Sequence, residues 1–412
     1  MTNKEKLLNE FARLAVEVGA NVQKGQVVVL NSPIHAAPFA RKVVEKAYLA
    51  GASQVIVNWS DDTVNKLYFL HASDEALTDV PEYSIQRLKY FIEKGACQIS
   101  ITSPNPEALK EVNPMRMAMA SKAAAPKTKF YSEHMMASKT QWTIVAYPNE
   151  VWAKKVFPDL DGEAAVEKLL EAILYTSRVD ENSDAVENWK EHMENLHVHN
   201  QILNKYNFKT LHFQNSLGTD LTIDLVEDHI WAGGGEMSGN GVYFAPNIPT
   251  EEAFTMPHRE KINGTVVSTK PLSVRGKLIP KFKLTFKDGM VVDFEAEEEY
   301  EALKTLLETD EGSKSLGEVA LISHDSPISN LNVLFYNTLF DENASCHLAL
   351  GNAYSMNIKD GTNMSVEELK AKGFNVSNIH VDFMFGSSDM EITGTTHDGE
   401  VVEIFRKGNF VI

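Results

Sequence analysis

The chain has 412 residues, and its 57 acidic side chains outnumber its 39 basic ones, which gives a formal net charge of −18. This length predicts two or three domains. Hydrophobic residues make up 43% and charged residues 23% of the chain, which is typical of a soluble globular protein and excludes a disordered, collagen-like or coiled-coil chain. The acidic excess argues against nucleic acid as a partner, because phosphate binding needs a concentrated basic surface.

The first half of the chain alternates short apolar strands with amphipathic helices. We expect an opening helix with Leu7, Phe11 and Leu14 on one face, and a second helix over about residues 37–50. The predicted strands cover residues 27–30, 54–57, 98–101 and 142–146. Apolar strands that alternate with helices are typical of a mostly parallel sheet covered on both faces. The sequence therefore predicts an α/β domain over residues 1–205.

The pattern changes after the polar segment at residues 179–184 and a helical stretch that runs to about Tyr206. From Thr210 onward, alternating runs are joined by turn sequences. Asp288-Gly289 between two such runs is a strong hairpin signal. We predict a mixed α+β domain over residues 206–412.

The location of the protein is constrained by three weak signals. No stretch reaches the ~18 apolar residues of a membrane span, so no membrane partner is expected. The two cysteines, Cys97 and Cys346, are too few for a disulfide framework, and the first residues lack the apolar region of a secretion signal. We therefore expect a cytoplasmic protein.

Glycine-rich segments do not predict a nucleotide site. Residues 233–241 lack the G-x-G-x-x-G spacing of dinucleotide-binding proteins. Residues 312–317 have the glycine spacing of a P-loop, but Glu318 stands where the phosphate-binding lysine belongs. These segments are interpreted as flexible turns.

Residues 378–386 contain a better candidate for chemistry. If this segment is a strand, its apolar residues at 379, 381, 383 and 385 share one face, which sends His380 and Asp382 together to the other. An imidazole and a carboxylate so placed can reach one cation or two adjacent ones. An ordinary surface pair is the more common interpretation of a lone His-x-Asp sequence.

Other charged residues of this half stand in apolar or small-residue stretches: Glu252, Glu318, Glu342 and His347. A charge in such a stretch is costly unless it is paired or bound to a metal. With only two cysteines, imidazole and carboxylate would dominate any metal site, which suits zinc, cobalt or manganese. Sequence spacing leaves open whether these segments meet.

Three motifs together resemble those of the thermophilic-type metallo-aminopeptidases, peptidase family M29, which includes aminopeptidase T, aminopeptidase S and the PepS enzymes. The motifs are Asn247-Ile248-Pro249-Thr250-Glu251-Glu252, Glu342-Asn343-Ala344-Ser345-Cys346-His347 and His380-Val381-Asp382. The resemblance extends over essentially the whole chain. It implies a cytoplasmic, homodimeric exopeptidase with two divalent metal ions, zinc or cobalt, in its C-terminal domain.

Carried over position by position, the resemblance implies a set of site residues. The implied metal ligands are Glu252, Glu318, His347, His380 and Asp382. Glu342 matches an acidic residue of the centre, either as a ligand or as a proton-transfer group, and Tyr354 matches a tyrosine beside the metals. Glu251 is adjacent to Glu252, and we favour Glu252 as the ligand.

The expected function is a two-metal aminopeptidase that removes N-terminal residues from short peptides with a free N-terminus. Glu342 would move the proton from water to the leaving amine, and Tyr354 would donate a hydrogen bond to the oxyanion. The N-terminal domain would enclose the site and form the dimer. The alternatives are another metal-dependent peptidase, such as a dipeptidase or carboxypeptidase, and a non-enzymatic α/β binding protein whose acids and histidines form structural pairs.

Overall fold

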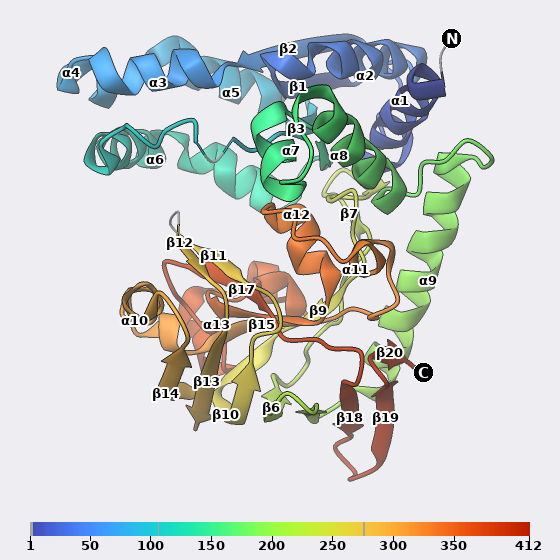
Figure 1. Ribbon diagram of the computed structural model, residues 1–412, viewed down its shortest axis with the longest axis vertical. Helices are drawn as coiled ribbons and strands as arrows, with labels where there is room; N and C mark the ends of the chain where they lie inside the picture. The colour runs from blue at the N-terminus through green and yellow to red at the C-terminus, as the bar shows by residue number, and fades with distance from the viewer. Residues whose placement is uncertain (1–2, 106, 275–276) are drawn as a thin grey trace. The chain divides into compact units, whose positions relative to one another are not determined.

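The computed structural model describes residues 3–105, 107–274 and 277–412, which form two compact units (Figure 1). Unit 1 comprises Met1–His192 and Gly235–Pro249, and unit 2 comprises Met193–Gly234 and Thr250–Ile412. The sequence placed the boundary at residues 205/206. In the structure the division falls inside helix α9 (Ala185–Tyr206), and residues 235–249 belong to unit 1 rather than to the second half.

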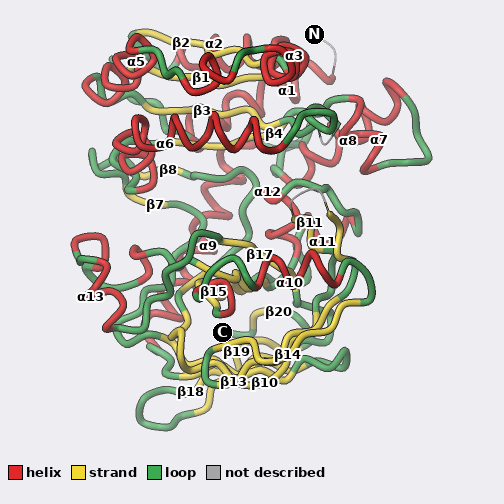
Figure 2. Tube along the Cα trace, turned by 90° about the vertical axis from the view of Figure 1, so that its left-hand side faces the viewer, coloured by secondary structure: helices red, strands yellow, loops and turns green. Residues whose placement is uncertain are grey.

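Unit 1 is built on a four-stranded parallel sheet with strand order β2-β1-β3-β4. Its strands are β1 (Val27–Pro33), β2 (Gln54–Ser60), β3 (Cys97–Thr102) and β4 (Trp142–Ala146). Figure 2 shows them among the helices of this unit. Val27–Leu30 in β1 are all buried, as a central strand between helical layers requires. The predicted α/β class and all four predicted strands are confirmed.

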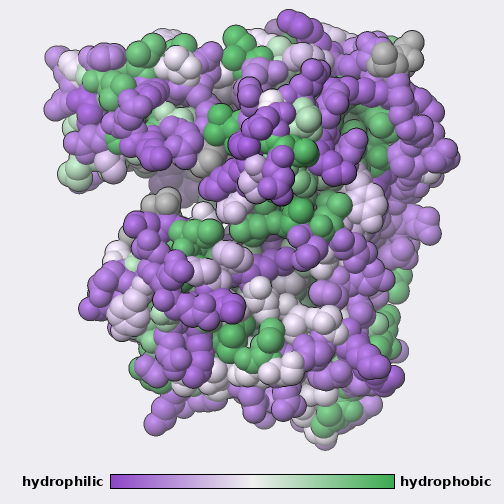
Figure 3. Space-filling view, viewed as in Figure 1, coloured by the Kyte–Doolittle hydropathy of each residue, from purple (hydrophilic) through white to green (hydrophobic). Residues whose placement is uncertain are grey.

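The helices of unit 1 connect and flank these strands. They are α1 (Asn3–Leu14), α2 (Ala37–Leu49), α3 (Asp62–His71), α4 (Asp74–Thr78), α5 (Glu82–Glu93), α6 (Pro114–Met136), α7 (Glu150–Val156) and α8 (Gly162–Thr176). In the described part of the chain, no helix is long and apolar enough to cross a membrane. Figure 3 shows that hydrophilic residues cover most of the viewed face, with apolar residues in smaller groups.

Unit 2 contains a large antiparallel sheet and a smaller one. The large sheet has the order β14 (Met290–Ala296), β13 (Phe282–Lys287), β10 (Pro257–Val267), β6 (Asp220–Leu225), β5 (Thr210–Gln214), β18 (Glu391–Thr395), β19 (Val401–Arg406) and β20 (Asn409–Phe410). The smaller sheet has the order β17 (His380–Met384), β16 (His347–Gly351), β15 (Leu316–Leu321) and β9 (Ala253–Thr255). With the short helices α10 (Tyr300–Leu307), α11 (Pro327–Leu331), α12 (Thr338–Asp341) and α13 (Val366–Ala371), the sheets confirm the α+β prediction.

The main core of unit 2 lies between these two sheets. Side chains from both sheets belong to one buried cluster. Phe213 of β5 meets Phe385 with ring centroids 5.3 Å apart, and Phe282 of β13 meets Phe383 of β17 at 5.4 Å, both edge-on. One face of the smaller sheet is therefore committed to this core, and the opposite face is free to carry polar groups.

The predicted hairpin joins β13 to β14. Asp288 and Gly289 both have positive φ angles, 48° and 85°, which is the conformation that a two-residue hairpin turn requires. The Asp-Gly sequence supplies the two residue types that tolerate it. The hairpin prediction is confirmed.

Two glycines with positive φ differ in the space around them. Gly351 lies in the smaller sheet, and Gly399 lies in the turn between β18 and β19 of the large sheet. A Cβ at Gly351, at the end of β16, would lie 2.2 Å from the carbonyl oxygen of Ile379, whereas a Cβ at Gly399 would have nothing within 4 Å. Gly399→Ala should lower the free energy of unfolding by about 1–3 kcal/mol through backbone strain alone. Gly351→Ala should lower it by a further ~1–3 kcal/mol because of the overlap. Both residues lie in unit 2, so urea unfolding followed on one transition compares them, and equal losses would contradict the packing described.

Candidate metal centre

The smaller sheet of unit 2 positions the predicted ligands through its register. Glu318 of β15 pairs with Ala349 of β16, and Ala349 pairs on its other side with Asp382 of β17. Residues that pair across neighbouring strands point to the same face of a sheet. The two carboxylates therefore flank a position that carries only a methyl group, which leaves space between them.

The remaining predicted ligands lie on the same face or beside it. His347 begins β16 two residues before Ala349, and His380 lies two residues before Asp382 in β17. Glu252 directly precedes β9, the strand paired with β15. Leu348 and Leu350 of β16 point the opposite way and belong to the hydrophobic core. Strand alternation thus separates the polar cluster from the core.

Cys346, which directly precedes β16, points to the core side of the sheet, as the alternation requires. It is buried in the hydrophobic cluster, and its sulfur exchanges hydrogen bonds with the backbone of Ile322 at 3.4 Å in both directions. Burial raises the pKa of its thiol to about 12. The side chain is therefore a small buried group that faces away from the side occupied by His347.

Both histidines are held by backbone carbonyl groups. Nδ1 of His347 lies 2.8 Å from the carbonyl oxygen of Glu342, and Nδ1 of His380 lies 2.7 Å from that of Asn352. A carbonyl oxygen can only accept, so each Nδ1 carries the proton and donates it. Each Nε2 is consequently directed at the carboxylates, which is the arrangement found for histidines that bind metals.

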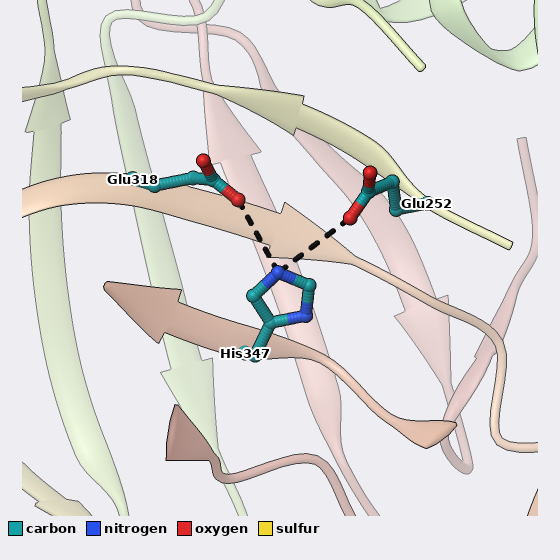
Figure 4. A group of neighbouring side chains, drawn as sticks. All are labelled: Glu252, Glu318 and His347. Carbon is teal, nitrogen blue, oxygen red and sulfur yellow. Dashed lines mark hydrogen bonds and ion pairs between the residues drawn. The ribbon is translucent and has the colours of Figure 1, made fainter. Parts of the chain in front are cut away.

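The carboxylates meet the two Nε2 atoms at short distances. Nε2 of His347 lies 3.2 Å from Oε1 of Glu318 and 3.6 Å from Oε2 of Glu252 (Figure 4). Nε2 of His380 lies 3.6 Å from Oε2 of Glu318 and 3.4 Å from Oδ1 of Asp382. Glu318 is thus shared, with one oxygen turned to each histidine.

These contacts define two groups of potential ligands. Glu252, Glu318 and His347 form the first, and Glu318, His380 and Asp382 form the second. Within each group the ligand atoms lie within 4.8 Å of one another. One carboxylate common to two adjacent triads is an arrangement that could hold two cations side by side.

The electrostatics of the cluster are dominated by buried negative charge. Burial and the neighbouring carboxylates Glu318 and Asp382 raise the pKa of Glu252 to about 7. Burial lowers the pKa of both histidines, but the hydrogen bond from His347 to Glu318 and the surrounding acids outweigh it and raise that of His347 to about 10. Asp382 and Glu318 likewise raise the pKa of His380 to about 9. The cluster therefore favours added positive charge.

The donor set fits a divalent metal. Every ligand atom is an oxygen or an imidazole nitrogen, a combination that suits zinc and cobalt. Oδ1 of Asp382 is buried, and its contact with Nε2 of His380, at 3.4 Å, is longer than a normal hydrogen bond. A buried carboxylate oxygen is costly unless a cation or a proton satisfies it, so this oxygen can accept a metal ion in place of the imidazole.

Glu342 and Tyr354 lie at the edge of the cluster. Glu342 belongs to the short turn Glu342–Ala344 before β16 and lines the same pocket as Asp382. Burial and the charges of Asp382 and Glu252 raise the pKa of its carboxyl well above the ordinary value. The ring of Tyr354 packs against that of His380 with centroids 4.7 Å apart, and the residue as a whole is 37% exposed.

The seven residues singled out from the sequence are thus brought into one region. Glu251 lies outside both groups of ligands; its backbone N–H donates to Oδ1 of Asn343 at 2.8 Å. Sequence reasoning missed Asp341, whose buried carboxylate accepts hydrogen bonds from the backbone N–H groups of Phe335 at 2.7 Å and Asn337 at 2.9 Å. The adjacent acids Asp341-Glu342 in an otherwise apolar run were the available signal.

The whole chain is similar to known proteins. The model of the thermophilic metalloprotease (M29) family matches residues 4–410. Aminopeptidase 2 of Geobacillus stearothermophilus is 48% identical over 410 residues, covering 100% of this chain and 99% of the relative. Aminopeptidase AmpS of Bacillus subtilis is 48% identical over 403 residues, 98% of each chain. The solved structure of AmpT from Thermus thermophilus superposes with a TM-score of 0.91 at 37% identity, covering 99% of this chain and 100% of that one.

Proposed function

The chain belongs to the thermophilic metalloprotease (M29) family, and we propose that it is a metal-dependent aminopeptidase that releases N-terminal residues from short peptides. The observation that carries the proposal is the pair of histidines whose Nε2 atoms face a shared Glu318. Its relatives carry the name aminopeptidase, so a carboxypeptidase, a dipeptidase or a non-enzymatic binding protein is not favoured.

We propose that the site holds two divalent ions, zinc or cobalt. Glu252 and His347 would hold one, His380 and Asp382 the other, and Glu318 would supply one oxygen to each. Two such ions, when bound, polarise the scissile carbonyl and make a water molecule more acidic. The four acids Glu252, Glu318, Glu342 and Asp382 offset the positive charge.

The chain's own residues supply the remaining chemistry. Glu342 shares a pocket wall with Asp382, a position from which its carboxylate can accept a proton from the attacking water and pass it to the leaving amine. The phenol of Tyr354, beside His380, can donate a hydrogen bond to the developing oxyanion. Glu342 is therefore assigned proton transfer in this proposal, and Tyr354 oxyanion stabilisation.

We also propose a cytoplasmic homodimer with peptides as its partners. Both cysteines are free and buried, as suits a reducing compartment. None of the described side chains of α3 or α6 is buried, although Leu67, Tyr68 and Met115 are apolar. A second copy of the chain that covers α3 and α6 would remove those apolar side chains from water.

The activity is tested by hydrolysis of leucine p-nitroanilide with the purified protein. Activity should disappear after chelation and return when zinc or cobalt is added, because the ligand cluster alone supplies no activated water. N-acetylleucine p-nitroanilide is the matched control and should not be cleaved. Cleavage of both substrates, or no cleavage after metal is restored and bound, would contradict the proposal.

Metal content tests the shared role of Glu318. Glu318→Gln keeps the side chain's size but removes its charge, so we expect loss of both ions, measured as metal per chain by plasma mass spectrometry. Asp382→Ala removes a ligand of only one group and should leave at most one ion. Retention of two ions by either variant would refute the corresponding ligand assignment.

Tyr354→Phe removes the proposed oxyanion donor and nothing else from the site. We expect kcat to fall by about 10²–10³ with metal content unchanged, the typical loss for one such donor. Tyr175→Phe, on the exposed surface of unit 1, is the control and should leave kcat unchanged. An unaltered kcat in Tyr354→Phe would remove this tyrosine from the mechanism.

A further inference from the structure

A pocket lies directly beside the ligand cluster within unit 2. Its volume is about 110 Å³, and Asp382 and Glu342 form part of its wall. A single water molecule needs only ~10–15 Å³ of such space, so the pocket is large enough for an amino-acid side chain. The remaining wall is mixed: its apolar residues are Pro271, Leu272, Leu278, Leu334 and Met384, and its polar residues are Ser273, Tyr336, Asn337, Thr338 and Asp341.

We propose that this pocket receives the side chain of the substrate's first residue, that it accommodates a side chain of about the size of leucine, and that it selects against acidic side chains. The inference rests on the proposed aminopeptidase function and deepens it. In that reaction the free amine and the scissile carbonyl must lie against the cluster, and only one Cα separates them. The side chain on that Cα therefore starts beside the ligand cluster. The pocket begins at Asp382, within one side-chain length of that point.

The acidic residues of the wall explain why an acidic side chain is disfavoured. Such a side chain would face the carboxylates of Asp341, Glu342 and Asp382, which all line the pocket. Like charges at this distance repel strongly in a buried site.

Asp341 does not offer a free carboxylate to a basic side chain. Its two oxygens accept the backbone N–H groups of Phe335 and Asn337, and it interacts electrostatically with Lys270. Leu334, Tyr336 and Asn337, which line the pocket, lie in or next to the segment that these bonds hold. Asp341 is therefore a positioning residue that holds one wall in place.

Substitution of Leu334 tests the pocket, because this wall residue belongs to neither ligand group. Leu334→Trp should fill the pocket and lower kcat/KM for leucine p-nitroanilide by about 10-fold or more, the range for a steric change in a side-chain pocket. Alanine p-nitroanilide, whose methyl does not need the pocket, should stay within about twofold. Leu334→Ala should enlarge the pocket and shift preference from leucine toward phenylalanine p-nitroanilide. Leu217→Trp, at an exposed position of the same unit, is the matched control.

The outcomes separate this inference from the function beneath it. An equal fall on leucine and alanine substrates by Leu334→Trp with metal content retained, together with no shift in Leu334→Ala, would overturn the pocket assignment while the aminopeptidase stands. If the unaltered chain cleaves glutamate p-nitroanilide as well as it cleaves the leucine substrate, the selection against acidic side chains is overturned. No cleavage of any p-nitroanilide by the metal-loaded, unaltered chain would instead overturn the proposed function.

Discussion

The site depends on two hydrogen bonds from imidazole Nδ1 atoms to backbone carbonyl groups. The carbonyl of Glu342 precedes β16 and that of Asn352 follows it, so the two ends of one strand orient both histidines. The carbonyl of Asn352 is itself fixed, because the N–H of the same peptide group, which is that of Ala353, donates to the carbonyl oxygen of Asn375. Without these bonds each ring could turn, and Nε2 would no longer face Glu318. The orientation of the whole cluster is therefore set by the backbone, which responds little to changes in side-chain protonation.

The same strand reconciles a polar cluster with a folded core. In β16, His347 and Ala349 face the acids while Leu348 and Leu350 enter the main core. A slip of one residue in the pairing would exchange these faces, so the apolar contacts of Leu348 and Leu350 enforce the register that the site requires. Burial of several carboxylates destabilises the fold by itself. The sheet-to-sheet core beneath the cluster must offset that cost.

The sequence predicted local patterns better than it predicted how they meet. Alternation correctly placed His380 and Asp382 on one face of a strand, opposite Phe383 and Phe385. It could not show that Glu252, Glu318 and His347 arrive beside them, because the strand order β17-β16-β15-β9 is fixed by long-range pairing. The ligand assignments came from family resemblance, and their geometry now supports them without testing them. The return of residues 235–249 to unit 1 and the role of Asp341 had no periodic signal at all.

The sequence could not predict the pocket either, because its walls also come from segments that meet only through long-range pairing. The origin of each wall indicates which residues can change substrate specificity. His380, Asp382 and Met384 alternate along one face of β17, so the strand that carries two proposed ligands also supplies a wall of the pocket. Met384 pairs with His347 across the sheet, so altering its size would disturb a ligand as well as the pocket. Leu334 and Leu278 stand outside that sheet and carry no such coupling. Substrate preference is therefore free to vary through these two walls, while β17 is constrained by the metal centre.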